Sequence, residues 1–430
     1  MRVAFLNLGC KVNKYEIDLL KEKFELAGHF VVGFDEQADM YCINSCSVTN
    51  MSDRKTRQMV SKARAKNKDA IVAVIGCSVQ SNNENEDSFK EADIILGNDK
   101  KMNLLEVVQN LKKDKHKRAI YLEDISKVKR YKEVGMLNKG YDIREAIKIE
   151  DGCNNFCSYC IIPYIRGRVR SRDISSIKQE ALNLVKNGVK EIVLVGIEVA
   201  SYGKDLEDCD LFDVLNILEE IDGLERIRLS SMEPRFLTEE NIQKLSKYTK
   251  LCPHFHISMQ SGNNDVLKRM NRKYTKALLI EVCNNARKYF KDPYLASDVI
   301  AGFPKETDEE FEDTINTINK MKLSEIHVFK YSKRKYTAAS KMDGQVDGNI
   351  KKQRSNILLS LSKKLNKAFL EKYINMKVEV LFENCTDGVL SGYTPNYIKV
   401  KVKGDKKLCG TIQDVVITSL EKDTLQGNLD

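Results

Sequence analysis

The chain has 430 residues, of which 42% are hydrophobic and 31% are charged. That length exceeds one typical domain, so two or three domains are expected. No continuous apolar stretch approaches the length that spans a bilayer. The start, MRVAFLNLGCKVNKYEIDLL, is interrupted by Cys10, Lys11 and Lys14 and does not read as a signal peptide. These features exclude a membrane-spanning class and predict a cytoplasmic protein.

The formal net charge of +9 is compatible with a polyanionic partner, and equally with an ordinary basic surface. The chain carries twelve cysteines. In a reducing compartment they do not favour a disulfide framework. They indicate a mixture of buried small side chains and metal ligands.

Residues 1–112 alternate short apolar runs with helix-period segments, which predicts a βαβ layer domain. The runs rich in β-branched residues predict buried parallel strands over Arg2–Gly9, Ala38–Ser45 and Ala70–Gly76. Helices are predicted over Lys14–Gly28 and Ser52–Lys66. The basic, weakly periodic stretch 113–140 is expected to be a linker.

Residues 141–370 are predicted to form the central domain. Six strand candidates follow one another: Ala146–Asp151, Glu191–Ile197, Arg226–Ser231, His254–Met259, Tyr294–Phe303 and Glu325–Ser332. Helical patterns separate most of them: Ser176–Asn187, Leu211–Glu220, Asn264–Phe290 and Asp308–Met321. Six βα units fall short of a closed eightfold barrel, so a partial (β/α)6 barrel is expected and the fold class is α/β.

After a helical pattern over Gln353–Tyr373, residues 371–430 alternate apolar and polar side chains at period two. VEVLFE, YIKVKVK and DVVITSLE are separated by Gly388, Gly392 and Gly404. This pattern predicts a small antiparallel β-barrel.

Three cysteines lie close together in DGCNNFCSYC, directly after the first strand of the central domain. Cys153, Cys157 and Cys160 would therefore lie at the carboxyl edge of the strands, where active sites of parallel barrels are found. Structural zinc normally takes four protein ligands, so three thiols leave one metal position open. The alternatives are a zinc knuckle completed by a distant ligand, or three buried thiols.

Three further cysteines each end a predicted strand of the N-terminal domain. Cys10 follows LNLG, Cys46 follows INS and Cys77 follows VIG. Because the carboxyl ends of parallel strands lie on one edge of a sheet, these thiols are expected to converge. Three buried core cysteines are the alternative.

CxxxCxxC with Tyr159 before the last cysteine resembles the signature of radical S-adenosylmethionine (SAM) enzymes. The longer string DGCNNFCSYCIIPYIRGRVRSR resembles the methylthiotransferase branch. The strings GCKVNKYE, INSCSVTN and VIGCSVQ resemble its auxiliary-cluster motifs, and CKVN is closer to the tRNA threonylcarbamoyladenosine branch. The resemblance implies two [4Fe–4S] clusters, one on each cysteine triad, and SAM as cofactor.

The same resemblance implies SAM contacts from the ends of the strands. Tyr159, Gln260 and Ser261 are candidate contacts and Glu198 is another; they lie in the motifs VGIEVASYG and HFHISMQSG or in the cysteine loop. His254 and His256 share one face of their strand, and burial inside the barrel explains them as well as a role in the site does. Lys305 stands where the family usually has glycine.

RNA-binding residues are predicted at two places. Arginines alternate along RGRVRSR, so in an extended segment all four would point one way and grip phosphates; they are Arg166, Arg168, Arg170 and Arg172. A solvated edge strand is the alternative. The C-terminal barrel resembles a TRAM domain, in which Tyr393 and Tyr397 would stack on bases. A structural cap is the alternative there.

The resemblance implies a tRNA methylthiotransferase that converts N6-threonylcarbamoyladenosine at tRNA position 37, in the anticodon loop, to its 2-methylthio derivative. Replacing an unactivated C2–H of adenine requires a radical, which the cofactors would supply. The expected partners are tRNA and an electron donor such as a flavodoxin or ferredoxin. The alternatives are the same reaction on isopentenyladenosine or on a ribosomal-protein aspartate, or a non-catalytic metal-containing RNA-binding protein.

Overall fold

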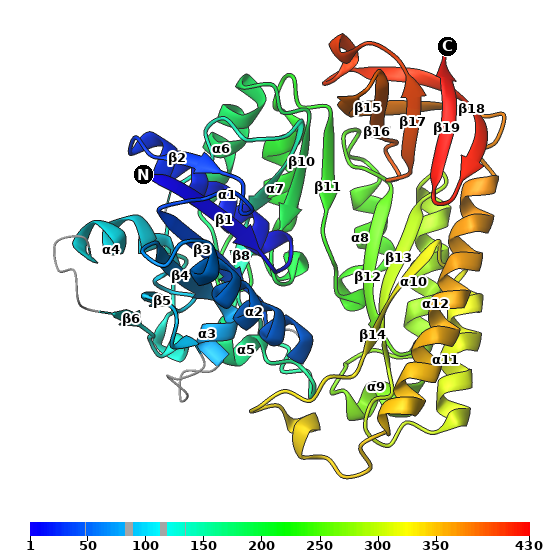
Figure 1. Ribbon diagram of the computed structural model, residues 1–430. Coiled ribbons are helices and arrows are strands. Elements are labelled where there is room, and N and C mark those ends of the chain that lie inside the picture. The colour runs from blue at the N-terminus through cyan, green and yellow to red at the C-terminus, as the bar shows by residue number, and fades with distance from the viewer. Residues whose placement is uncertain (48, 82–88, 112–117, 134) are drawn as a thin grey trace.

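The computed structural model describes residues 1–47, 49–81, 89–111, 118–133 and 135–430. Figure 1 shows an N-terminal sheet region, a central curved sheet covered by helices, and a small C-terminal barrel. None of the helices in the described part of the chain is long and apolar enough to span a membrane. The predicted α/β class with a partial (β/α)6 barrel and a small terminal barrel is confirmed. The domain boundaries stay a prediction.

The N-terminal region is a six-stranded parallel sheet in the order β2-β1-β3-β4-β5-β6. Its strands are β1 (Arg2–Asn7), β2 (Phe30–Val32), β3 (Met40–Ser45), β4 (Ile71–Gly76), β5 (Ile94–Leu96) and β6 (Ala119–Tyr121). Its helices are α1 (Lys11–Leu26), α2 (Asn50–Lys66), α3 (Cys77–Ser81) and α4 (Leu104–Leu111), with short 3-10 turns η2 (Lys101–Asn103) and η3 (Ile125–Lys127). The stretch expected as a linker therefore contributes β6 and η3 to this region.

The central region has six parallel strands in two groups, β11-β10-β7 and β12-β13-β14. They are β7 (Arg144–Lys148), β10 (Glu191–Val195), β11 (Arg226–Leu229), β12 (His254–Gln260), β13 (Tyr294–Ala301) and β14 (Glu325–Lys330). Parallel bridges Ile227–Leu251 and Met232–Ile257 join the two groups. The predicted strands thus form one open, curved sheet.

Helices cover the outside of this sheet. They are α6 (Ile174–Lys186), α7 (Leu211–Glu219), α8 (Glu239–Leu245), α9 (Asn264–Arg269), α10 (Lys276–Tyr289), α11 (Asp308–Met321) and α12 (Gly348–Glu371), with turns η4 (Val199–Ser201), η5 (Pro234–Phe236) and η6 (Ala338–Lys341). The single helix predicted over Asn264–Phe290 is wrong, because the chain breaks into α9 and α10. Asn271 adopts a left-handed φ of 57° in the break, and the Thr275 side chain accepts a hydrogen bond from the Leu278 amide to start α10.

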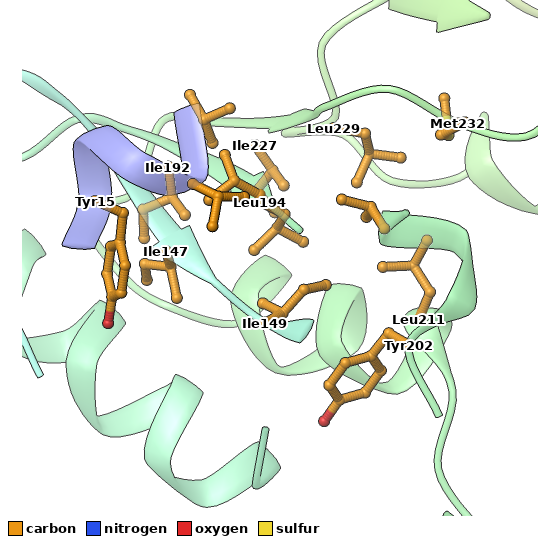
Figure 2. Close-up of a cluster of buried hydrophobic side chains, with 14 of the residues drawn as sticks. Tyr15, Ile147, Ile149, Ile192, Leu194, Tyr202, Leu211, Ile227, Leu229 and Met232 are labelled. Carbon is orange, nitrogen blue, oxygen red and sulfur yellow. The ribbon is translucent and has the colours of Figure 1, made fainter. Parts of the chain in front are cut away.

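Branched apolar side chains of β7, β10 and β11 fill the core between the sheet and its helices. Figure 2 shows this cluster, in which the strands contribute Ile147, Ile192, Leu194, Ile227 and Leu229. Tyr15 of α1 lies in the same cluster. The N-terminal region and the partial barrel therefore share one continuous core.

The C-terminal region is a closed five-stranded barrel in the order β15-β16-β17-β19-β18. Its strands are β15 (Lys377–Thr386), β16 (Val389–Tyr393), β17 (Lys399–Lys403), β18 (Ile412–Glu421) and β19 (Thr424–Leu429), with the turn η7 (Lys406–Leu408). The neighbours are antiparallel except β17 and β19, which run parallel. Figure 1 shows α12 running along the central sheet and ending at this C-terminal barrel.

Candidate iron–sulfur and cofactor site

The first cysteine triad (Cys153, Cys157 and Cys160, the loop triad) lies on a tight loop between two short strands. These are β8 (Glu150–Asp151) and β9 (Arg170–Ser171), which pair antiparallel, with α5 (Ile162–Ile165) between them. Gly152 has a φ of +86°, and a Cβ there would lie 1.9 Å from the Arg168 carbonyl oxygen. Only glycine fits this close approach, which folds the loop back on itself.

Burial raises the pKa of the Cys153 thiol to about 12 and also raises the pKa of Cys160. The charge of Cys157 adds to both shifts, so the three sulfur atoms influence one another. Metal binding has to displace protons from such thiols. The loop triad is thus a compact set of three soft ligands.

Arg272, which the sequence patterns did not single out, is aimed at this triad. Its Nη1 donates a hydrogen bond to Cys157 Sγ at 3.1 Å. Its Nη2 donates to the Ser258 carbonyl oxygen at 2.9 Å and its Nε to the Tyr274 hydroxyl at 2.6 Å. Hydrogen bonds to a ligating sulfur tune the reduction potential of an iron–sulfur cluster. The donor chemistry of the loop triad therefore fits such a cluster.

The second cysteine triad (Cys10, Cys46 and Cys77, the strand-end triad) follows three adjacent strands. Cys10 precedes α1 after β1, Cys46 follows β3, and Cys77 begins α3 directly after β4. β1, β3 and β4 are neighbours in the sheet, so their carboxyl ends lie side by side. Arg166 lies close enough to both Cys10 and Cys77 for their charges to raise its pKa.

The two triads lie on facing surfaces of the two regions. Cys77 packs with Ile161 and Ile165, which follow Cys160 in the loop. Asn98 Nδ2 donates to the Ile165 carbonyl oxygen at 2.7 Å and approaches Cys77 Sγ at 3.7 Å. Two separate cysteine sites therefore share one interface.

A cavity of about 220 Å³ opens at this interface. Tyr159 and Gln260, both predicted SAM contacts, line it together with Asp298 of β13. Thr49, three residues after Cys46, lines it from the N-terminal region. The cavity thus lies between the loop triad and the loop that carries Cys46.

The other two predicted SAM contacts face other partners. Ser261 is 1% exposed and its Oγ lies 3.1 Å from Thr314 Oγ1 on α11. Glu198 is buried, and its Oε1 accepts a hydrogen bond from the Glu233 amide at 3.0 Å. Burial, followed by the charge of Glu233, raises the pKa of Glu198 to about 7. These four assignments stay predictions, and the structure brings only Tyr159 and Gln260 into one cavity.

The arginine stripe does not form one exposed face. Arg168 is exposed and stacks over the Phe156 ring at 4.2 Å, whereas Arg166, Arg170 and Arg172 are buried. The prediction that all four guanidinium groups point one way is wrong, because it required an extended segment and β9 covers only Arg170 and Ser171. Three of the four guanidinium groups therefore form ion pairs inside the protein.

Arg166 forms the centre of a buried ion network between the two regions. Its Nη1 lies 3.1 Å from Asp151 Oδ1 and 3.2 Å from Glu16 Oε1 of α1. Lys148 and Lys101 also pair with Glu16, at 2.9 and 2.6 Å. Arg166 is held between carboxylates, and together with the two lysines it keeps the pKa of Glu16 well below its usual range. This network fixes α1, and with it Cys10, against the barrel.

Arg172 makes a second link, to Glu180 of α6, Glu133 and the Tyr15 hydroxyl. Arg170 lies 3.9 Å from Asp151 and donates to the Arg168 carbonyl oxygen. These contacts position the segment that follows the loop triad.

The rings of Tyr393 and Tyr397 are engaged within the protein. They stack on each other with centroids 4.9 Å apart. Arg144 of β7 lies over both rings, and Arg228 of β11 lies over Tyr397. The two tyrosines therefore dock the C-terminal barrel against β7 and β11 of the partial barrel.

Comparison with known proteins follows the same division of the chain. A family model described as the radical SAM superfamily matches residues 147–318, and one described as uncharacterized protein family UPF0004 matches residues 2–97. The radical SAM match contains the loop triad, and the other match contains the strand-end triad.

Relatives match over nearly the whole length. The chain is 39% identical to threonylcarbamoyladenosine tRNA methylthiotransferase MtaB of Bacillus subtilis, over 96% of this chain and 93% of that protein. It is 35% identical to tRNA-2-methylthio-N(6)-dimethylallyladenosine synthase of Alkaliphilus oremlandii, over 98% of this chain and 91% of that protein.

A solved structure supports the fold. The radical SAM methyltransferase TsrM of Kitasatospora setae matches with a TM-score of 0.57 at 14% identity, over 79% of this chain and 75% of that chain. Radical SAM enzymes use SAM and a [4Fe–4S] cluster, which together generate a carbon radical. The two cysteine triads, the two family matches and the full-length relatives lead to one conclusion: the chain belongs to the methylthiotransferase family of radical SAM enzymes.

Proposed function

We propose that the protein is a tRNA methylthiotransferase that converts N6-threonylcarbamoyladenosine at position 37 to its 2-methylthio derivative. The similarity to a protein of that name, 39% over 96% of the chain, carries the proposal. The anticodon loop of tRNA is the proposed substrate segment, and a flavodoxin or ferredoxin is the proposed electron donor. Exposed Arg168, beside the loop triad, is the proposed phosphate contact of the arginine stripe.

In this proposal the two cysteine triads hold two clusters with separate roles. The loop triad holds the cluster that binds SAM, with Tyr159 and Gln260 lining the cavity beside it. The strand-end triad holds an auxiliary cluster for the sulfur to be transferred. The contact of Cys77 with Ile161 and Ile165 supports a short path between the two sites.

A second acceptor, isopentenyl-type adenosine, is supported by the relatives named dimethylallyladenosine synthases. The test is nucleoside mass spectrometry of tRNA from a strain that lacks the gene, complemented with wild type or with Cys153→Ala. We expect the 2-methylthio threonylcarbamoyl nucleoside to be absent without the gene, restored by wild type and not restored by Cys153→Ala.

Cys385→Ala is the matched control, because Cys385 lies in the C-terminal barrel away from both triads. It should restore the nucleoside as wild type does. Loss and recovery of only the dimethylallyl derivative would assign the second acceptor instead. Persistence of both nucleosides in the deleted strain would contradict a role in either modification.

A further inference from the structure

Three neighbouring strands of the partial barrel bring two imidazoles and a carboxylate together, and one of the imidazoles, that of His327, is exposed. His256 lies on β12, Asp298 on β13 and His327 on β14, and Asp298 and His327 are register partners. One ligand atom from each residue lies within 4.8 Å of the others. His256 Nε2 is 3.0 Å and His327 Nδ1 is 3.5 Å from Asp298 Oδ1. None of the three residues belongs to a cysteine triad.

The spacing of these atoms fits ligands around one metal ion. Nitrogen and oxygen ligands bind zinc at about 2.0–2.2 Å, which places two ligands of a tetrahedral ion about 3.4 Å apart. The two distances to Asp298 Oδ1 bracket that value. Two histidines and one carboxylate suit zinc or iron(II) and leave at least one position for an exchangeable ligand.

The surroundings of the two histidines favour the same interpretation. His256 Nε2 is buried and lies 3.0 Å from Asp298 Oδ1, but the two atoms do not meet with the directional geometry of a hydrogen bond. A buried ring nitrogen without a well-directed hydrogen bond is costly, and a metal ion shared with the Asp298 carboxylate would satisfy it. His327 turns its other nitrogen, Nε2, toward Glu325 Oε2 at 3.6 Å. A carboxylate behind a ligating histidine is the usual outer partner in metal sites.

The cluster is accessible from two sides. Asp298 lines the cavity of about 220 Å³ that also contains Tyr159 and Gln260. His327 and Glu325 line a separate cavity of about 440 Å³ between the sheet, α12 and the C-terminal barrel. An ion can therefore reach the three residues, and its open position can face the cavity beside the loop triad.

We propose that His256, Asp298 and His327 form a third metal site, which binds one divalent transition-metal ion of the zinc and iron(II) class through nitrogen and oxygen ligands. The site joins three strands of the open sheet at their middle. It does not depend on the proposed function, because none of its ligands comes from the cysteine triads.

Zinc is the probe, because its X-ray absorption edge is separate from that of iron. Full-length protein with its cysteine sites loaded anaerobically with iron and sulfide is incubated with zinc, desalted and analysed for metal content and zinc-edge absorption. We expect about one zinc per chain with nitrogen and oxygen neighbours at about 2.0 Å and no sulfur at about 2.3 Å. His327→Gln and Asp298→Asn should each lower the bound zinc at least about 10-fold.

His29→Gln is the matched control, because His29 lies in the N-terminal region, where its Nδ1 is 3.4 Å from the terminal amine. It should retain the zinc. Circular dichroism checks that each variant is folded, and the absorption spectrum of wild type decides the ligand set even if a variant is not. A sulfur shell around the zinc, zinc retained by folded His327→Gln, or no stoichiometric zinc in folded wild type would each overturn the proposal.

Discussion

The loop triad and the strand-end triad each present three thiols, but the two sets are assembled in different ways. The loop triad occupies eight consecutive residues, and its shape depends on Gly152 and on the return of the chain at Gly167, whose carbonyl oxygen accepts from the Cys153 amide. The strand-end triad is spread over 68 positions, from Cys10 to Cys77, and exists only when β1, β3 and β4 are paired. The loop triad is therefore formed by a short stretch of chain, whereas the strand-end triad depends on the pairing of distant strands. The comparison predicts that they can be disabled separately.

The largest effect is expected at the loop triad. Cys157→Ala removes one of the three ligands of the cluster that would bind SAM and also the sulfur that Arg272 contacts. We expect reductive cleavage of SAM to fall at least about 1000-fold, to background, since a residue of the reacting centre is lost. Anaerobic assay of 5′-deoxyadenosine under dithionite measures this. Cleavage at wild-type rate would show that the loop triad does not hold the SAM cluster.

The strand-end triad should respond differently. Cys46→Ala is expected to leave SAM cleavage within about 3-fold of wild type while formation of the methylthio nucleoside falls at least about 100-fold, because cleavage and sulfur insertion use different ligands. Both products are quantified in one reaction. Equal loss of cleavage in Cys46→Ala and Cys157→Ala would mean that the two triads do not act separately.

A pair of glycine substitutions tests how each triad is built. A Cβ at Gly152 would lie 1.9 Å from the Arg168 carbonyl oxygen, and one at Gly76, whose φ is +95°, would lie 2.5 Å from Asn44 Oδ1. Gly152→Ala should disturb the loop triad and Gly76→Ala the strand-end triad, so each should lower the iron content from about eight to about four per chain.

Gly188→Ala is the control, because its φ is +96° but no heavy atom lies within 4 Å of its Cβ position. It carries the backbone strain without the overlap and should retain the iron. Iron analysis together with Mössbauer spectroscopy identifies which cluster is lost. Loss of all iron in either triad variant would show that the sites are not independent.

The smallest effect concerns Arg272, a charged donor to a sulfur of the loop triad, whereas at the strand-end triad the neutral Asn98 amide donates to Cys77 Sγ at 3.7 Å. Arg272→Gln removes the hydrogen bond to Cys157 Sγ and a positive charge beside it. We expect a more negative reduction potential of the loop-triad cluster and SAM cleavage slowed about 10-fold. A redox titration followed by electron paramagnetic resonance measures the potential. An unchanged potential with slower cleavage would assign Arg272 to cofactor positioning instead.

Much of the architecture could be predicted from local pattern. Apolar runs such as IVAVIG and IVLV form buried parallel strands, and the period-two alternation of the last sixty residues forms a closed barrel. β6 was missed because Ala119–Tyr121 is short and lies in a basic stretch, where pairing with β5 rather than hydrophobicity makes it a strand.

The same distinction applies to the candidate site, where local motifs could be predicted and long-range contacts could not. The spacing CxxxCxxC and the cysteines at three strand ends were visible in the sequence, since neighbouring residues or equivalent strand positions define them. Arg272 could not be predicted, because it lies 115 positions after Cys157 and directly follows a left-handed turn at Asn271. The prediction of one common arginine face fails for a related reason, because alternating residues share a face only in an extended strand.

Short-range patterns and motifs were enough to predict most of the strands and helices, the two sets of thiols and the family resemblance. Three-dimensional packing sets which charges are buried, which aromatic rings are in contact and which distant side chains meet. Arg166 reaches Glu16, Arg144 covers Tyr393, and His256, Asp298 and His327 meet on separate strands. The physical reason is that burial and charge pairing depend on what packs opposite a residue, and the partner lies far away in the chain.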